Sequence, residues 1–257
     1  MEIVIISLVA FLTAILTFFS GFGLGTILTP VMMLFFPVEI AIGLTGIVHF
    51  FNNIFKLFLV GNHANREVLI KFGIPAVLAA LLGSWLLFSI PDFKPLFTYS
   101  FLEMKFEVYP VKFMISILLL LFALMDIIPF FSKLQFSKNK LPLGGFFSGF
   151  FGGLSGIQGA LRSAFLIKAG LSKEVFIATA VVISTFVDFT RLSVYATQLS
   201  LSSLLEYKII LICAILSAIL GAFLGNKLLK KVTIHFLQIT IAIMLIIISL
   251  ALGLGWI

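Results

Sequence analysis

The chain has 257 residues, of which 61% are hydrophobic and only 11% are charged, and its mean hydropathy is +1.26. This composition excludes an ordinary soluble domain, and the length accommodates roughly six to eight membrane-spanning helices of about 20 residues each. The net charge of +7 does not point to a nucleic-acid partner, because the basic residues lie between apolar runs and form no single patch. The single cysteine, Cys213, excludes an internal disulfide framework and a cysteine-rich metal site.

The first half of the chain predicts one broken helical segment and three spans. The apolar run 3–35 is interrupted by glycines at 20–26, so we expect two helical pieces, 3–18 and 25–35. Apolar spans follow at 38–60, 68–90 and 111–129. Residues 91–110 mix charges with Phe and Tyr, which predicts an interfacial or extramembrane insertion.

The second half repeats this plan. It predicts a broken segment at 142–170 and spans at 173–196, 204–226 and 232–254. The lysine-containing loop 130–141 separates the halves, so we predict a first repeat over residues 1–135 and a second over 136–257. A shift of 135 positions, the difference between Gly156 and Gly21, also places Asp188 on Asn53 and Arg191 on Lys56. Paired glycine-interrupted segments in corresponding halves are typical of a transporter's binding site.

The distribution of basic residues decides between two topologies. If each broken segment crossed the membrane, the repeats would be parallel and the two basic loops 61–71 and 227–231 would face opposite sides. If each broken segment is a hairpin that enters and returns, the repeats are inverted. With both termini outside, the cytoplasmic face then holds Arg66, Lys71, Lys133, Lys138, Lys140, Lys168, Lys173, Lys227, Lys230 and Lys231, and the outer face Lys94, Lys105 and Lys112. The excess of cytoplasmic Lys and Arg favours the inverted arrangement, and the absence of a basic residue before Lys56 argues against a secretory signal.

Each predicted hairpin tip exposes backbone N–H groups at the start of its second half-helix, where the helix dipole adds partial positive charge. Two tips that meet from opposite faces would form a cradle for an anion. The predicted substrate-binding residues at the tips are Gly21, Gly23, Gly25, Thr26, Gly156, Gln158 and Gly159. The alternative is close helix packing, which we favour for the glycines between 144 and 153 because they have small-xxx-small spacing.

Arg162, about one turn into the half-helix after the second break, also enters the predicted substrate site. A guanidinium group at this depth is costly unless it is paired or binds an anion. Two interpretations stay open: Arg162 binds the substrate, or it forms a structural ion pair with Asp188.

The helices after the hairpins carry further polar residues on one face each. His49, Asn53 and Lys56 have helical spacing, and Ser184, Asp188 and Arg191 occupy the matching positions. We add Asn53, Asp188 and Arg191 to the predicted substrate site, and we name His49 and Asp188 as candidates for carrying a coupling proton. The alternatives are mutual neutralisation of Asp188 and Arg191, a hydrogen-bonded structural role for His49, and a Lys56 that extends to the membrane interface.

These motifs resemble the sulfite exporter TauE/SafE family, also called the toluene-sulfonate uptake permeases. The resemblance rests on Gly21-Phe22-Gly23-Leu24-Gly25 with the later Pro30 and Pro37-Val38-Glu39-Ile40-Ala41, and on Gly156-Ile157-Gln158-Gly159 with Leu171-Ser172-Lys173-Glu174. It covers essentially the whole chain. The second copy departs from the family pattern at Gln158, Arg162 and Phe165, where a glycine, an apolar residue and a proline are usual.

The resemblance implies a secondary transporter of small anions such as sulfite, sulfoacetate or other organosulfonates, with export as the favoured direction and alternating access around the two hairpin tips. The alternatives are an anion channel and a membrane-embedded subunit of a larger complex. We expect no enzyme, because the sequence has no His-Glu-x-x-His, no Gly-x-Ser-x-Gly and no second cysteine. We also expect no cofactor, no metal and no nucleic acid. The expected partners are the anion and the lipid bilayer of the inner (cell) membrane, with a homodimer as one option for assembly.

Overall fold

The computed structural model describes residues 1–20, 23–89, 94–101, 103–128, 138–167, 169–199, 204, 206–228 and 234–256. Helices dominate this part of the chain. The first half contains α1 (Glu2–Ser20), α2 (Gly25–Met32), α3 (Val38–Val60), α4 (Arg66–Val68), α5 (Ile74–Ser89) and α6 (Pro110–Ile127). The second half contains α8 (Leu141–Ser155), α9 (Gly159–Ile167), α10 (Lys173–Gln198), α12 (Lys208–Leu228) and α13 (Ile234–Gly253). Three short helices connect them: η1 (Gly61–His63), η2 (Leu69–Gly73) and η3 (Lys138–Lys140).

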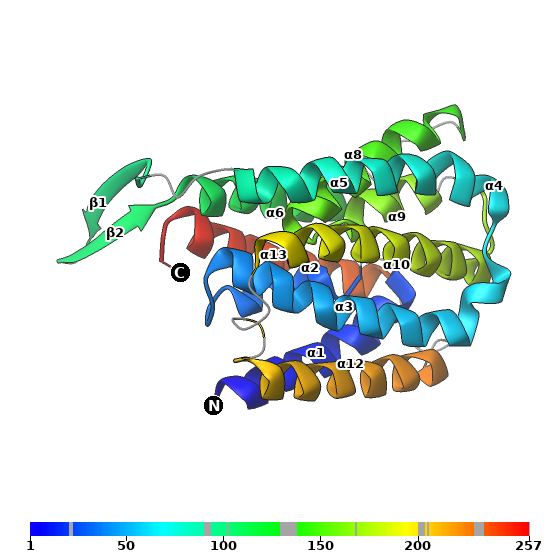
Figure 1. Ribbon diagram of the computed structural model, residues 1–257, viewed down its shortest axis with the longest axis horizontal. Coiled ribbons are helices and arrows are strands. Elements are labelled where there is room, and N and C mark those ends of the chain that lie inside the picture. Colours follow the sequence, from blue (N-terminus) through cyan, green and yellow to red (C-terminus); the bar gives the residue numbers. More distant parts are fainter. Residues whose placement is uncertain are drawn as a thin grey trace.

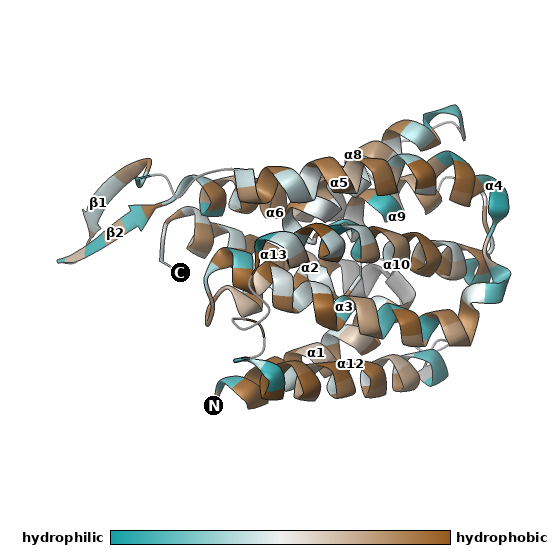
Figure 2. Ribbon diagram, in the orientation of Figure 1, coloured by the Kyte–Doolittle hydropathy of each residue, from teal (hydrophilic) through white to brown (hydrophobic). Residues whose placement is uncertain are grey.

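Four helices of the described residues are long and apolar enough to cross a membrane. They are Val38–His63, Arg66–Ser89, Lys173–Gln198 and Lys208–Lys227. Shorter apolar helices cover Glu2–Phe18, Pro110–Leu121 and Ala242–Gly253. The outer faces of the helices are mostly brown, that is, hydrophobic, in Figure 2. Phe58 and Trp85, for example, are 85% and 62% exposed, which suits contact with lipid and not with water.

One element departs from the all-α prediction. Strands β1 (Phe97–Phe101) and β2 (Met104–Val108) form an antiparallel hairpin within the segment that we expected to be an insertion. The sequence alternates here between apolar and polar residues, which is a period of two and not of 3.6. Glu103, at the turn, has a positive φ of 64°. The hairpin projects beyond one end of the helical bundle (Figure 1).

Helices from the two halves pack against one another in pairs. The main contacts join α1 with α12, α5 with α8, α3 with α10, and α6 with α13. Both chain termini lie at the end of the bundle that holds the hairpin, whereas α4 and the C-terminal end of α12 lie at the opposite end (Figure 1). Lys208 is the first residue of α12. It adds a fourth basic residue to the hairpin end, besides Lys94, Lys105 and Lys112 of the predicted outer face.

The packing interpretation of the α8 glycines is confirmed. An ideal Cβ on Gly149 would lie 1.9 Å from the carbonyl oxygen of Ala76, and one on Gly153 would lie 2.3 Å from that of Ala80. Such separations are far below van der Waals contact, so only glycine allows the α8 backbone to lie this close to α5. The α5–α8 pair therefore forms a rigid wall beside the second break.

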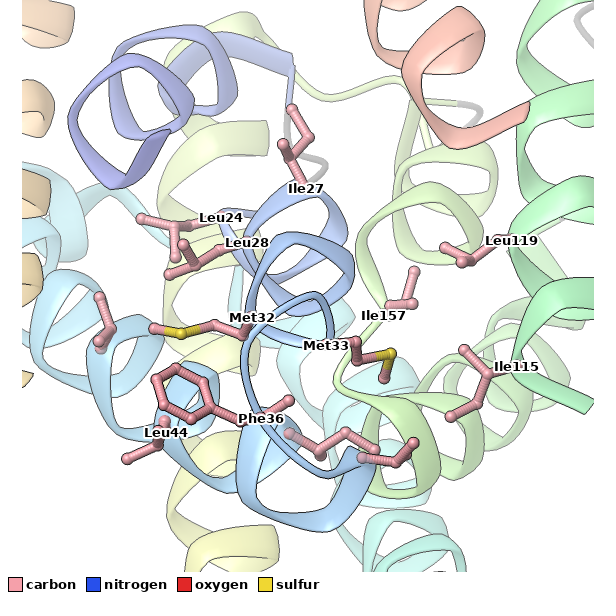
Figure 3. Packing of buried hydrophobic residues seen from close by; sticks show 14 of the residues in the cluster. Leu24, Ile27, Leu28, Met32, Met33, Phe36, Leu44, Ile115, Leu119 and Ile157 are labelled. Atoms are coloured by element: carbon pink, nitrogen blue, oxygen red, sulfur yellow. The ribbon is translucent and has the colours of Figure 1, made fainter. Parts of the chain in front are cut away.

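The short helix α2 is held in the interior by hydrophobic packing. All eight of its residues are buried. Leu24, Leu28 and Met32 belong to one apolar cluster together with Ile115 and Leu119 of α6 and Ile157 of the second break (Figure 3). A helix of this length is unstable on its own, so tertiary contacts of this kind fix its position. The first break is thereby held next to the second.

Candidate functional site

The two glycine breaks touch each other in the middle of the bundle. An ideal Cβ on Gly25, the first residue of α2, would lie 2.7 Å from the carbonyl oxygen of Gly156, which follows α8. Gly23 and Gly156 both have left-handed backbone conformations, with φ of 85° and 77°. A side chain at either position would be strained as well as crowded. Gly21, also predicted to bind substrate, lies outside the described residues.

Side chains from both halves approach these glycines closely. An ideal Cβ on Gly23 would lie 2.9 Å from His49 Nε2 and 3.7 Å from Arg162 Nη2. One on Gly156 would lie 2.5 Å from Arg191 Nη1. The missing side chains therefore make room for an imidazole and two guanidinium groups at the crossing of the breaks.

Asp188 is the centre of a buried polar network between α3 and α10. Its Oδ2 atom lies 2.7 Å from His49 Nδ1 and accepts a hydrogen bond of 2.9 Å from Asn53 Nδ2. Its Oδ1 atom accepts from Arg191 Nε at 3.0 Å and lies 2.9 Å from Arg191 Nη2. All four side chains are buried, with at most 3% of their surface exposed. Asp188 and Arg191 therefore form the ion pair that was one of the predicted alternatives, and His49 and Asn53 of α3 also contact the carboxylate.

Lys56 is a functional candidate that the sequence analysis missed. We expected its side chain to extend to the interface, but this is wrong: Lys56 is only 3% exposed. Its ammonium lies 5.3 Å from the centre of the Phe18 ring. The Asn52 side-chain amide satisfies both of its polar atoms when its oxygen faces Lys56, and this oxygen then accepts a hydrogen bond from the Lys56 ammonium at 3.3 Å. No carboxylate of the described residues lies within ion-pair distance of Lys56. Its helical spacing from His49 and Asn53 was the available signal.

Arg162 and Lys56 both line a small cavity. Arg162 is 2% exposed, and its Nη1 donates a hydrogen bond to Ser184 Oγ. The cavity has a volume of about 20 Å³ and is lined by Thr17, Phe18, Gly23, Asn53, Lys56, Arg162, Ile177, Ala180, Val181 and Ser184. Since one water needs at least about 10–15 Å³, this space holds one water molecule and must widen to admit an oxyanion.

On the Gly156 side, several buried polar atoms have no hydrogen-bond partner among the described residues. They are both amide atoms of Gln158, Thr29 Oγ1 and Arg191 Nη1. Buried polar atoms are nearly always satisfied, and leaving one unsatisfied costs about 1–3 kcal/mol. Gln158 was predicted from the sequence, whereas Thr29 was not. Such atoms are suited to a ligand or to water.

The structure separates the predicted site residues into groups. Gly23, Asn53 and Arg162 line the cavity, and His49 and Asp188 contact the lining residue Asn53. Thr26 and Gly159 occupy the first turns of α2 and α9 and are not among the described lining residues. Within the described residues, no group of three His, Cys, Asp or Glu side chains could hold a metal ion.

The comparisons with known proteins identify one family. A family model described as sulfite exporter TauE/SafE matches residues 6–252, nearly the whole chain, which confirms the resemblance found in the glycine motifs. No curated protein and no solved structure matches the chain.

Proposed function

Because the chain belongs to the sulfite exporter TauE/SafE family, we propose that it is a secondary transporter that binds a small anion at the crossing of its two glycine breaks. The family and the apolar helices make it a multi-pass membrane protein. We place it in the inner (cell) membrane, with export as the favoured direction. The substrate class that we propose is sulfite and small organosulfonates such as sulfoacetate.

The observation that carries this proposal is the charge of the buried site. Lys56, Arg162 and Arg191 are buried cations, whereas Asp188 is the one buried carboxylate of the described residues. Asp188 is already bound by Arg191 and His49, so among the described residues the cavity lined by Lys56 and Arg162 has more buried cations around it than buried carboxylates. An excess of buried cations over buried carboxylates is costly in a membrane protein, and an oxyanion would reduce that cost.

The chemistry of the lining groups fits a sulfur oxyanion. A guanidinium presents planar N–H donors that match sulfonate or carboxylate oxygens, and a lysine ammonium adds a point charge. The Asn53 amide and the Ser184 hydroxyl supply neutral donors in the same cavity. The starts of α2 and α9 add the positive ends of two helix dipoles nearby.

The packing of the helices supports an inverted-repeat mechanism. The 135-residue shift converts the α1–α12 pair into the α8–α5 pair, and it converts the α3–α10 pair into itself. This pattern is what two equivalent halves around a common axis would produce. The helices α6 and α13 also pack together, but the shift carries α6 to 245–262 and so does not place it on α13. We propose that the two halves rock about the contact of the glycine breaks, which would open the 20 Å³ cavity to one side and then to the other.

Counterflow of labelled sulfite into vesicles that hold the purified protein alone tests the proposal. We expect uptake in the wild type, and an apparent affinity lowered about tenfold or more in Lys56→Gln, the usual scale for a hydrogen bond to a charged group. Lys71→Gln is the matched control, because that lysine is exposed and paired with Glu67 at 2.7 Å. Counterflow that is absent from the wild type with both sulfite and sulfoacetate would refute the transport function.

A further inference from the structure

We infer that His49 binds a proton when the cavity beside it binds the anion, so that each anion crosses the membrane together with one proton. This inference rests on the proposed function, because it assigns a coupling ion to the same site.

The two nitrogens of His49 have different surroundings. Nδ1 lies 2.7 Å from Asp188 Oδ2, a distance that fixes the ring and places a hydrogen on Nδ1. Nε2 points toward Gly23, which lines the cavity, and an ideal Cβ on Gly23 would lie only 2.9 Å away from it. The absence of a side chain at Gly23 therefore leaves Nε2 next to the anion site. The Asn53 amide nitrogen lies 3.5 Å from Nε2 and already donates to Asp188 at 2.9 Å, so its contact with Nε2 is weak and this nitrogen can take up a proton.

Arg162 Nη2 also lies near Gly23, 3.7 Å from the position of an ideal Cβ on that glycine. A proton on Nε2 and a substrate between Lys56 and Arg162 would thus be close neighbours. Opposite charges at close range strengthen each other's binding, and this coupling is reciprocal: the anion favours the proton as much as the proton favours the anion. Simultaneous binding of this kind is the requirement for symport.

The charged and polar groups described around His49 lie on three elements. From α10 come Asp188 and Arg191, from α9 comes Arg162, and from α3 itself come Lys56 and the neutral Asn53. The cations oppose protonation of the imidazole as long as the cavity holds no anion, and among these described groups only Asp188 favours it. Binding of the anion reverses this balance, which makes the proton load dependent on the substrate.

The other groups of the network are less suited to carry the proton. Asp188 accepts hydrogen bonds from Asn53 and Arg191 and also contacts His49, so its carboxylate is fully used as an acceptor. Lys56 and Arg162 are needed as cations at the anion site. In His49, by contrast, the contact of Nδ1 with Asp188 fixes the ring, and Nε2 lies beside Gly23, which lines the cavity.

The proton balance of the cycle is simple, because no covalent bond between heavy atoms changes. One proton from water binds Nε2 on the loading side, and the same proton returns to water when the anion leaves on the other side. A doubly charged anion then carries one net negative charge across the membrane. An inside-negative potential would favour its export, whereas an acidic exterior would favour its uptake.

The test uses vesicles that hold the purified protein and a trapped pH-sensitive dye, with labelled sulfoacetate as the probe because its sulfonate stays ionised. In the wild type we expect about one proton to enter with each sulfoacetate. In His49→Gln, whose amide can still bond to Asp188 but cannot carry a proton, we expect this ratio to fall at least tenfold, whatever uptake remains. His63→Gln, which alters an exposed histidine of η1, is the matched control and should keep the wild-type ratio.

Three results would overturn the inference. Wild-type uptake without proton entry would refute the coupling and leave anion transport intact. This measurement uses only the wild type, so it does not depend on whether a variant folds. An unchanged ratio in His49→Gln would assign the proton to another group. If the wild type transports neither sulfite nor sulfoacetate, the proposed function fails and the coupling fails with it.

Discussion

Asn53 donates a hydrogen bond of 2.9 Å to Asp188, and these two residues are also the pair that the 135-residue shift places in equivalent positions. A residue and its equivalent can touch only where the two halves meet, near the axis that would relate them. The contact therefore marks the place where α3 and α10 contribute matching positions to one site. The two positions nevertheless differ in charge, since one half supplies an amide and the other a carboxylate.

Removal of the Asp188 charge should destabilise the protein before any substrate is added. Asp188→Asn leaves Arg191 buried without its carboxylate, and loss of one partner from a buried pair typically costs about 3–5 kcal/mol. Thermal unfolding of the purified variant in detergent would show this cost. Glu67→Gln is the matched control, because the Glu67–Lys71 pair is about half exposed and its loss should shift stability by less than about 1 kcal/mol. Equal melting temperatures for the two variants would contradict the central role of Asp188.

Two left-handed glycines, Gly156 and Gly170, allow the cost of backbone strain to be measured separately from the cost of a side-chain clash. Gly156 and Gly170 have nearly the same φ, 77° and 73°, but a Cβ on Gly170 would meet nothing within 4 Å. Gly170→Ala should therefore cost only the strain of about 1–2 kcal/mol and leave transport intact. Gly156→Ala should add displacement of Arg191 and lower transport about tenfold or more. Gly156→Leu, which fills still more of the site, should abolish it.

Transport assays on both alanine variants, beside their melting curves, give the measurement. If Gly156→Ala transports as well as Gly170→Ala at equal stability, the second break is only a packing device.

Much of the helical fold could be predicted from composition. A run of about 20 apolar residues predicts a membrane helix whatever its neighbours are, and α3 (Val38–Val60) follows such a run. The hairpin β1–β2 was not predicted, because composition alone does not reveal the period of two in its ten strand residues. The division into a first and a second repeat stays a prediction.

The site was less accessible to sequence reasoning. Helical spacing places His49, Asn53 and Lys56 on one face, but it does not say whether that face meets lipid, water or another helix. The contact between His49 and Asp188 joins residues 139 positions apart, which only the tertiary packing of α3 on α10 determines. Burial of Lys56 depends on the same packing, and for this reason the expected interfacial position was wrong.

The topology can be tested with single cysteines in a Cys213→Ser background. Ser100→Cys, on the exposed hairpin, should react with a membrane-impermeant reagent in intact cells, because we predict that the hairpin end faces outward. Asn62→Cys, in η1 at the opposite end, should react only with a permeant reagent. Labelling of both positions from the same side would contradict the predicted arrangement.

The last prediction decides between the two roles of Arg162. Its side chain is buried, donates to Ser184 and lines the cavity. If it binds substrate, Arg162→Gln should weaken binding of sulfite and sulfoacetate by about 1.5–3 kcal/mol, which is about tenfold or more. Stability without substrate should hold or rise, because a costly buried cation is gone. Isothermal titration and a melting curve on the same preparation provide both numbers.

If Arg162 instead serves as a structural partner of Asp188, the signs change. Arg162→Gln should then melt at a lower temperature without any ligand, because the removal of one charge leaves its partner less compensated. The loss in the double variant Arg162→Gln with Asp188→Asn should then be smaller than the sum of the two single losses. Ser184→Ala should lose only about 1 kcal/mol, the scale of one hydrogen bond. We expect the first outcome, since Asp188 already has Arg191, His49 and Asn53 around it. Unchanged affinity with lowered stability would remove Arg162 from the substrate site and leave Lys56 as the cation that holds the anion there.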